Sequence, residues 1–332
     1  MKQGRRATFR AGTILASRDG IALIMVLWAL TILSVIVLSF SMMARTETHS
    51  AATFKAVVTN RFLAEAGIER GVMEIFFRNA NKRQPVVFEG REPVRIDGTP
   101  YTGTLEKGQY VYRVTDESGK IPLNALTDSS AVLLKNLLTQ MGYQQQDVDT
   151  VADSILDWRD QNELHRLNGA ESDYYMSLPN PYKAKNANFD TVEELLLVKG
   201  VTPAMLYGDG KKKGIIDYVT VYSNRNSINV NAASREVLMA VPGMTPEKVD
   251  YVLAQREGTG IEKTQDIAAL LGESFRLMGS YLTIGDSNTF AIDATGKTGE
   301  GQTGYGIRAI LMVEGAAKYR YVYYKSPAQV GP

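Results

Sequence analysis

Residues 18–28 read RDGIALIMVLW, and they open the segment around which the whole chain is organised. No charged residue occurs from Ile21 to Ala44, and a helix that spans a bilayer needs about 20 apolar residues. Apolar residues then recur at helical spacing among charged ones, and no proline precedes Gln84. The pattern predicts one continuous helix from Gly20 to about Phe77, embedded in a membrane in its first half and packed on a soluble domain in its second.

Basic residues precede the apolar run, at Lys2, Arg5, Arg6, Arg10 and Arg18. This charge bias places the N-terminus in the cytoplasm and the rest of the chain across the membrane. A secretory signal peptide has a shorter apolar core and a small-residue cleavage site after that core. Here the small residue, Gly20, stands directly before the apolar run instead.

This order of basic leader, glycine and long apolar helix resembles the N-terminus of type IV pilins and type II secretion pseudopilins. The resemblance implies a prepilin leader over residues 1–20, cleavage by a prepilin peptidase between Gly20 and Ile21, and N-methylation of Ile21. Met25 occupies the fifth mature position, where most of these proteins carry glutamate. The pseudopilin family called general secretion pathway protein K typically lacks that glutamate. An ordinary signal-anchor helix is the alternative interpretation of the helix pattern alone.

Composition excludes several classes of site. The 332 residues carry a net charge of +1, so no global excess of charge indicates a nucleic acid or an acidic partner. The absence of cysteine excludes disulfides, zinc–thiolate sites and cysteine nucleophiles. The two histidines, His49 and His165, are far apart in the sequence, which argues against a histidine metal site or a serine–histidine hydrolase.

Strand patterns flank a helical block. β-Rich runs at 101–105 and 110–114 predict one hairpin, and runs at 307–314 and 318–325 predict a second. We expect an α+β fold in which the long N-terminal helix packs, as in pilins, on one antiparallel sheet, with a large all-α domain inserted. The predicted parts are the leader 1–20, the transmembrane segment 21–44, a discontinuous pilin-like domain 45–119 and 278–325, the inserted domain 120–277, and a disordered tail 326–332.

The helical block contains an internal repeat. Lys120–Ala125 resembles Ser227–Ala232, and each is followed by a serine that can cap the next helix. Leu197–Pro203 resembles Ala240–Pro246, and both place a glycine hairpin before a threonine–proline helix start. This pattern resembles helix-hairpin-helix or SAM-like modules.

Helix-hairpin-helix modules bind the DNA backbone, so a DNA-binding pseudopilin of a competence-type system is an alternative function. In this chain Thr202 and Thr245 replace the second glycine of the hairpin, and a side chain there hinders close approach to phosphate. Few cations surround the hairpins, whereas DNA binding needs several. These features favour a protein–protein module.

An acidic cluster lies between Asp147 and Asp173, and its oxygen atoms suit calcium, which takes 6–8 oxygen ligands. Leu164 and His165 stand where an EF-hand loop needs an oxygen ligand and a glycine, which excludes an EF-hand. The predicted ligands of an irregular calcium site are Asp157, Asp160, Asn162, Glu171 and Asp173. A solvated acidic face is the alternative, and no nucleophile accompanies the carboxylates to indicate an enzyme.

Four motifs, in this order, are similar to the general secretion pathway protein K family: Lys120–Asn124, Asp157–Asp160, Gly169–Glu171 with Tyr174–Tyr175, and Ile228–Ala232. The resemblance covers nearly the whole chain. It implies a helical insertion in a pilin-like domain and calcium bound in that insertion. Family members often carry aspartate where this chain has Asn162, a weaker, neutral ligand.

The resemblance also implies a function. It is that of a non-enzymatic minor pseudopilin, anchored in the inner membrane with its soluble domain in the periplasm, which caps the pseudopilus tip and supports export of folded proteins across the outer membrane. The implied partners are the other minor pseudopilins of the tip complex, the inner-membrane assembly platform and prepilin peptidase. Met25 fits a first subunit, because the glutamate of the other members is thought to meet the N-terminal amine of the preceding subunit. A plain membrane-anchored binding domain, with no leader cleavage, is a third alternative.

Overall fold

The computed structural model describes residues 19–81, 94–106, 108–210, 212–223, 225–257, 260–299, 303–316 and 318–330. The predicted leader therefore lies almost entirely outside the described residues. The chain divides into two compact units, residues 1–58 and residues 59–332.

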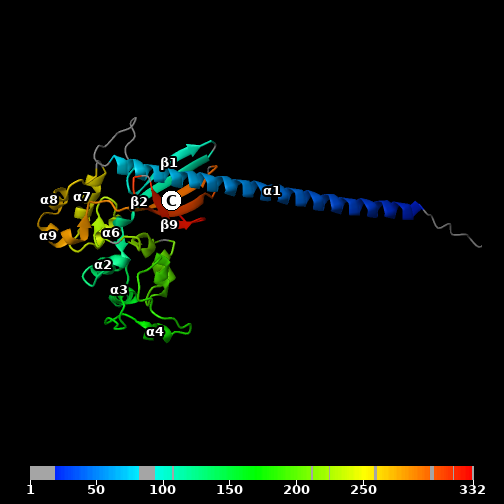
Figure 1. Ribbon diagram of the computed structural model, residues 1–332. Coiled ribbons are helices and arrows are strands. Elements are labelled where there is room, and N and C mark those ends of the chain that lie inside the picture. The colour runs from blue at the N-terminus through cyan, green and yellow to red at the C-terminus, as the bar shows by residue number, and fades with distance from the viewer. Residues whose placement is uncertain are drawn as a thin grey trace, which may run out of the picture. The chain divides into compact units, whose positions relative to one another are not determined.

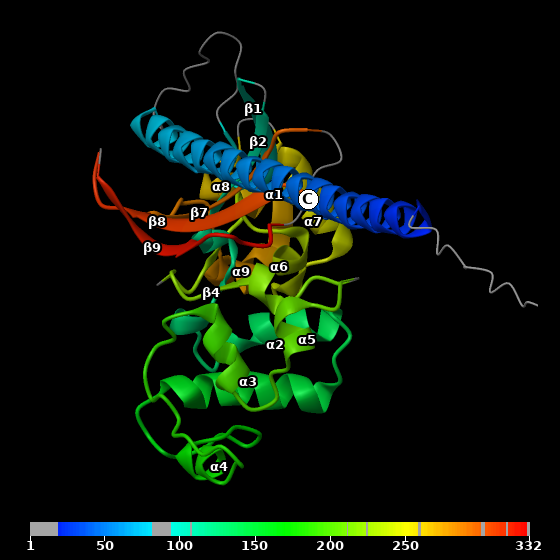
Figure 2. The same cartoon turned by 90° about the vertical axis from the view of Figure 1, so that its right-hand side faces the viewer.

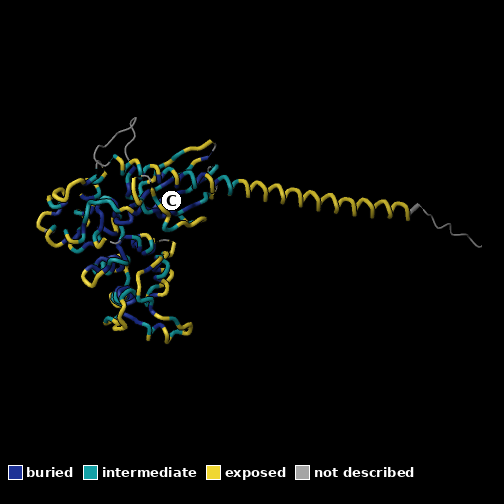
Figure 3. Tube along the Cα trace, viewed as in Figure 1, coloured by how far each residue is buried: buried dark blue, intermediate teal, exposed yellow. Residues whose placement is uncertain are grey.

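Helix α1 begins at Asp19 and ends at Ala80 (Figure 1). Within the first unit, every residue from 21 to 55 is exposed to solvent (Figure 3). Such exposure of a charge-free apolar stretch is unfavourable in water, because each buried CH₂ group gains about 0.8 kcal/mol. By length and composition this helix is able to cross a membrane. The predicted long N-terminal helix is confirmed.

A five-stranded antiparallel sheet forms the centre of the second unit. Its strands are β1 (Asp97–Leu105), β2 (Gly108–Asp116), β7 (Thr289–Lys297), β8 (Tyr305–Val313) and β9 (Tyr319–Lys325). They lie in the order β1-β2-β7-β8-β9, so the first predicted hairpin meets the second through β7. In this register Val114 of β2 lies opposite Ile292 of β7, and both side chains are fully buried.

Residues 59–80 of α1 pack on this sheet through a face of apolar and small residues. Ile68, Val72 and Ile75 form one core with Phe290, Ile292 and Leu311 of the sheet. Glycine in the helix permits close approach, since a Cβ atom on Gly71 would lie 2.8 Å from Ile292 Cγ2. The α+β arrangement of a long helix on an antiparallel sheet is therefore confirmed.

Between β2 and β7 lies a region of short helices with its own apolar core. In Figure 2, α3 lies between α2 and α4. The α-helices are α2 (Ala131–Gln140), α3 (Gln145–Arg159), α4 (Ser172–Met176), α5 (Pro203–Tyr207), α6 (Arg235–Ala240), α7 (Pro246–Arg256), α8 (Thr264–Leu271) and α9 (Phe275–Met278). The 3₁₀-helices are η1 (Glu117–Gly119), η2 (Leu123–Ala125), η3 (Val192–Leu197), η4 (Ile215–Asp217), η5 (Gly272–Ser274) and η6 (Gly279–Tyr281).

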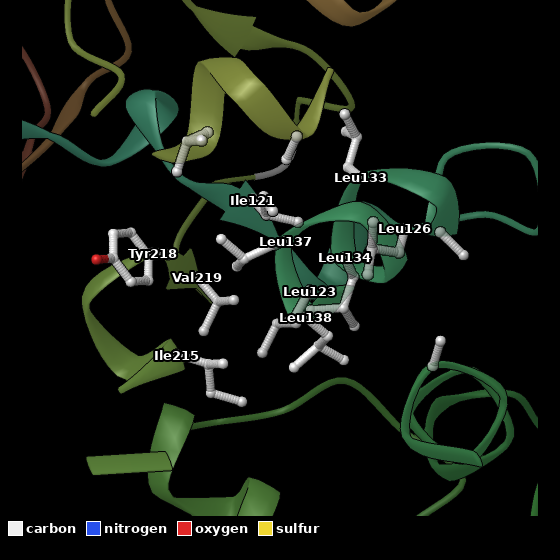
Figure 4. Close-up of a cluster of buried hydrophobic side chains, with 14 of the residues drawn as sticks. Ile121, Leu123, Leu126, Leu133, Leu134, Leu137, Leu138, Ile215, Tyr218 and Val219 are labelled. Carbon is white, nitrogen blue, oxygen red and sulfur yellow. The ribbon is translucent and has the colours of Figure 1, made fainter. Parts of the chain in front are cut away.

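The core of this region is built largely from leucine and isoleucine side chains. Figure 4 shows part of it, with Leu134, Leu137 and Leu138 of α2 beside Ile121 and Val219. All of these side chains are at most 1% exposed. Their spacing along α2 gives one apolar face, as its amphipathic pattern predicts.

The region is not entirely α-helical, which corrects the prediction of an all-α insertion. β3 (Ile121–Pro122) pairs in parallel with β4 (Val219–Thr220), and β5 (Ile228–Asn229) pairs in parallel with β6 (Leu282–Thr283). Each partner strand lies far away in the sequence, so no local hairpin signal announces the pairing. The segment Val192–Leu197 forms the 3₁₀-helix η3 rather than an α-helix.

One buried carboxylate, that of Asp116, lies where the chain leaves β2 for the helical region and where it returns to β7. Asp116 ends β2 and accepts hydrogen bonds from the backbone N–H and hydroxyl groups of Ser118 and Ser287. Its side chain is fully buried, and burial raises the pKa of this carboxyl group. Four donors thus hold the two connections of the helical region together.

The C-terminal tail differs from the predicted disorder as far as Val330. The backbone N–H of Ala328 donates to the carbonyl oxygen of Gly306 at 2.8 Å. This contact places the start of the tail alongside β8. The last two residues lie outside the described part of the chain.

Candidate metal centre

Two helix ends bring the predicted acidic ligands together. α3 buries Val148, Val151 and Ile155 on its apolar face, and in its last turn it also buries Asp157, which lies on the opposite side of the helix. Asp160 is the C-cap residue of α3, and Glu171 is the N-cap residue of α4.

Asp157, Asp160 and Glu171 each place one carboxylate oxygen within 4.8 Å of the others. Asp157 is 0% exposed and Glu171 is 1% exposed. Neither oxygen of Glu171 has a hydrogen-bond partner among the described residues. Burial, together with the charges of Asp157 and Asp160, raises the pKa of Glu171 to about 7. Burying an ionised carboxylate without a partner costs free energy, so a bound cation would stabilise this group of carboxylates.

One cation of the chain already lies beside the group. Nη1 of Arg166 is 2.7 Å from Oδ1 of Asp157 and 2.9 Å from Oδ2 of Asp160. The same guanidinium also pairs with the exposed carboxylate of Asp128. Arg166 leaves Glu171 without a direct partner, because no ion pair or hydrogen bond joins the two side chains among the described residues. The surplus of negative charge and the unpaired oxygens fit a divalent cation.

Gly169 shapes the wall of this group. A Cβ atom at Gly169 would lie 1.8 Å from Oδ2 of Asp157. Gly169 was predicted only as part of a sequence motif, and Arg166 was not predicted to lie in the site. The local signal for Gly169 was its position two residues before the predicted ligand Glu171. The local signal for Arg166 was that it is one of only two arginines, with Arg159, inside the acidic segment.

We predict that Gly169→Ala weakens binding of a divalent cation at this group at least about tenfold, because the added methyl group must displace the Asp157 carboxylate. Isothermal titration of the full chain with calcium measures the effect. Gly315→Ala is the matched control, since a Cβ atom there meets nothing within 4 Å. Equal affinity of the two variants would contradict the placement of Asp157 in the site.

The two other predicted ligands have different positions. Nδ2 of Asn162 donates to Oδ1 of Asp160 at 2.7 Å, so Asn162 lies beside the group through its amide nitrogen. Asp173 is not one of the three carboxylates whose oxygen atoms meet, so its role as a ligand stays a prediction. Asp173 is in the first turn of α4, where its exposed Oδ1 accepts from the N–H of Tyr174.

The hairpin threonines occupy the helix N-termini that a phosphate would need. Oγ1 of Thr202 accepts from the N–H of Met205 in α5, and Oγ1 of Thr245 accepts from the N–H of Lys248 in α7. These caps satisfy N–H groups that DNA-binding hairpins direct at phosphate. The geometry therefore argues against phosphate binding at these two helix starts.

Two family models, both described as "Type II secretion system (T2SS), protein K", match residues 119–208 and residues 228–277. The chain belongs to the type II secretion system protein K family. The protein K family is a structural, non-enzymatic group of pseudopilins. The two matches cover the segments that contain the acidic group and the internal repeat.

Individual relatives agree with this assignment to the protein K family. The chain is 24% identical over 263 residues to type II secretion system protein K of Pseudomonas aeruginosa, which covers 75% of each protein. It is 26% identical over 115 residues to the protein of the same name from Pectobacterium carotovorum subsp. carotovorum, which covers 32% of this chain and 33% of that one.

A solved structure has the same fold. It is a chain of the crystal structure of the GspK–GspI–GspJ complex from the type 2 secretion system of enterotoxigenic Escherichia coli. The two chains superpose with a TM-score of 0.62 at 18% sequence identity, covering 85% of this chain and 100% of that chain. The sheet, the helix on it and the helical region thus form an arrangement found in a solved type II secretion complex.

Proposed function

We propose that this chain is a minor pseudopilin that caps the tip of the periplasmic pseudopilus of a type II secretion system and supports export of folded proteins across the outer membrane. The observation that carries the proposal is the match of the protein K family to both parts of the helical region. Other minor pseudopilins of the tip complex, the inner-membrane assembly platform and prepilin peptidase are the proposed partners. The related crystal structure is of a complex with GspI and GspJ, which supports the first of these.

The proposed location is a single pass through the inner membrane. Residues 21–44 would span it, with the N-terminus in the cytoplasm and the rest of the chain in the periplasm. The uncharged first half of α1 and the basic residues before it support this orientation. Met25 lacks the carboxylate that would meet the N-terminal amine of a preceding subunit, which supports a position at the very tip.

The proposed domain division makes residues 120–277 an inserted helix-hairpin-helix or SAM-like domain. It would interrupt a pilin-like domain formed by residues 45–119 and 278–325. The position of the helical region between β2 and β7 of one sheet supports an insertion. A separate apolar core in that region supports its independence.

We further propose that the metal centre holds calcium through Asp157, Asp160 and Glu171. Carboxylate oxygens are the ligands that calcium prefers, and no nitrogen or sulfur ligand accompanies them in the described group. Bound calcium would compensate the buried charge and hold α4 to the end of α3. Arg166 would remain as the counter-charge to Asp128.

Processing at Gly20 tests the central proposal. Co-expression with a prepilin peptidase should yield a chain that starts at Ile21 with one added methyl group, seen in its intact mass and N-terminal sequence. Gly20→Val should keep the leader, because a branched side chain replaces the small residue before the cleaved bond. A wild-type chain that retains Met1, while a control prepilin is cut in the same cells, would refute the pseudopilin assignment.

A further inference from the structure

Two asparagines in the helical region make the same unusual contact. Nδ2 of Asn124 donates to the carbonyl oxygen of Phe189 at 2.9 Å, and its Oδ1 accepts from the N–H of Phe189 at 2.8 Å. Asn231 makes the corresponding pair of bonds with Ile261, both at 2.9 Å. Each asparagine side chain thus pairs with the backbone N–H and C=O of one distant residue, as a neighbouring β-strand would. Both asparagines lie at the same position of the sequence repeat.

Two arginines repeat a second contact. Arg159 is the last residue of α3 and Arg256 is the last residue of α7. Each guanidinium donates to two backbone carbonyls, one residue before the asparagine and two residues after it. The accepting carbonyls are those of Leu123 and Leu126 for the first arginine, and of Val230 and Ala233 for the second.

The elements around these contacts correspond as well. α2 and α3 are joined through Gly142 with φ +91°, and α6 and α7 are joined through Gly243 with φ +81°. α2 and α3 have 10 and 15 residues, whereas α6 and α7 have 6 and 11. Both helices of the second pair are therefore shorter by about one turn of 3.6 residues. The strand pair β3–β4 belongs to the first set, and β5–β6 to the second.

These correspondences define two copies of one module. The first module comprises residues 121–220 and the second module comprises residues 228–283. They differ most between the arginine and the residue that its asparagine binds. Residues 160–188 fill this interval in the first module, whereas only residues 257–260 fill it in the second.

The insertion 160–188 carries two of the three carboxylates of the metal centre, and it contributes Ala170, Tyr175 and Ala184 to the apolar core. Its buried residues are Gly169, Ala170, Glu171, Tyr175 and Ala184. Tyr175 packs on Trp158 of α3 with ring centroids 5.1 Å apart, and this aromatic contact ties the insertion to the module. Leu164 and Leu167 are 80% and 93% exposed, so the part of the insertion before Gly169 has no apolar anchor at these positions.

We infer that residues 160–188 are an insertion which the first module does not need in order to fold, and that a bound cation orders this insertion. The inference rests on the proposed metal site. The second module closes the same asparagine and arginine contacts with four residues in place of the insertion. Asp157 belongs to α3, whereas Asp160 and Glu171 belong to the insertion, so their negative charges repel the insertion from α3. A cation that neutralises these charges would hold the insertion to α3.

Hydrogen exchange of the full chain in detergent, with calcium or with chelator, tests the inference. The N–H groups of Gly169 and Ser172 should exchange at least about tenfold faster with chelator. The N–H of Phe189, held by Asn124, should change by less than about twofold, and so should that of Ile261. Equal loss of protection at Phe189 and in the insertion would overturn the inference, because the cation would then stabilise the whole module.

A variant in which the connecting segment of the second module replaces that of the first, called the swap, supplies the second measurement. Residues 160–188 are replaced by the four residues Glu257–Gly260 of the second module. We expect this chain to retain protection at Phe189 and to show no calcium response in its Tm. Two results together would contradict the claim that the first module folds without residues 160–188. They are loss of protection at Phe189 in the swapped chain, and opening of the whole wild-type module as one unit with chelator. Absence of calcium binding by wild type in a titration would instead refute the metal proposal and with it the role of the cation, while a folded swap would leave the duplication intact.

Discussion

Gly296→Ala is expected to destabilise the second unit by about 3 kcal/mol, which lowers its Tm by about 10 °C. Gly296 lies in β7 directly beneath α1. A Cβ atom there would be 2.2 Å from the carbonyl oxygen of Asn60 and 2.5 Å from the backbone nitrogen of Ala64. Both neighbours are main-chain atoms of a helix, so no side chain can rotate away to make room. The helix and the sheet must separate locally, which weakens the core around Ile68 and Ile292.

Scanning calorimetry of the detergent-solubilised full chain measures this effect. Gly315→Ala provides the matched control, because a Cβ atom on Gly315 has no neighbour within 4 Å. The control should unfold within about 1 °C of wild type, as surface substitutions usually change stability by no more than about 0.5 kcal/mol. If both variants unfold at the wild-type temperature, residues 59–64 do not lie against β7 as described.

The sequence predicts this contact surface well, because its signals are local. The 3.6-residue period from Phe54 onward indicates a helix, and alternation with turn residues indicates the hairpins. The two modules were visible only as a repeat in sequence. Their closing contacts join Asn124 to Phe189 and Asn231 to Ile261, over separations that no period or turn signal covers.

The metal centre illustrates the same limit. Asp157 and Asp160 are three residues apart at a helix end, so their proximity follows from helix geometry. Glu171 joins them because the insertion folds back, and its backbone places Asp173 on the exposed side of α4. Composition alone therefore identifies the acidic segment, while the fold decides which of its carboxylates meet.

Because Glu171 is buried, its substitution should raise the Tm of the metal-free chain and remove the stabilisation of the chain by calcium. Glu171→Gln should raise the Tm of the chain in chelator at pH 8 by about 3 °C, because it removes a buried charge that has no partner. The same substitution should abolish stabilisation by calcium, because a neutral amide replaces a ligand carboxylate. Asp173→Asn is the control, since Asp173 is exposed and outside the group of three, and it should keep both the wild-type Tm and the calcium response.

The pH dependence follows from the same carboxyl group. Its pKa is raised from 4.5 to about 7 in the folded chain, so the folded, metal-free state retains a proton that the unfolded state has already released. The stability of the metal-free chain should therefore fall as pH rises from about 5 to about 7. Calcium binding should show the opposite trend, because the proton competes with the ion, and its affinity should increase about tenfold between pH 6 and pH 8. Calcium titrations at both pH values measure this increase, and an equal affinity at the two would show that Glu171 binds no proton that calcium displaces.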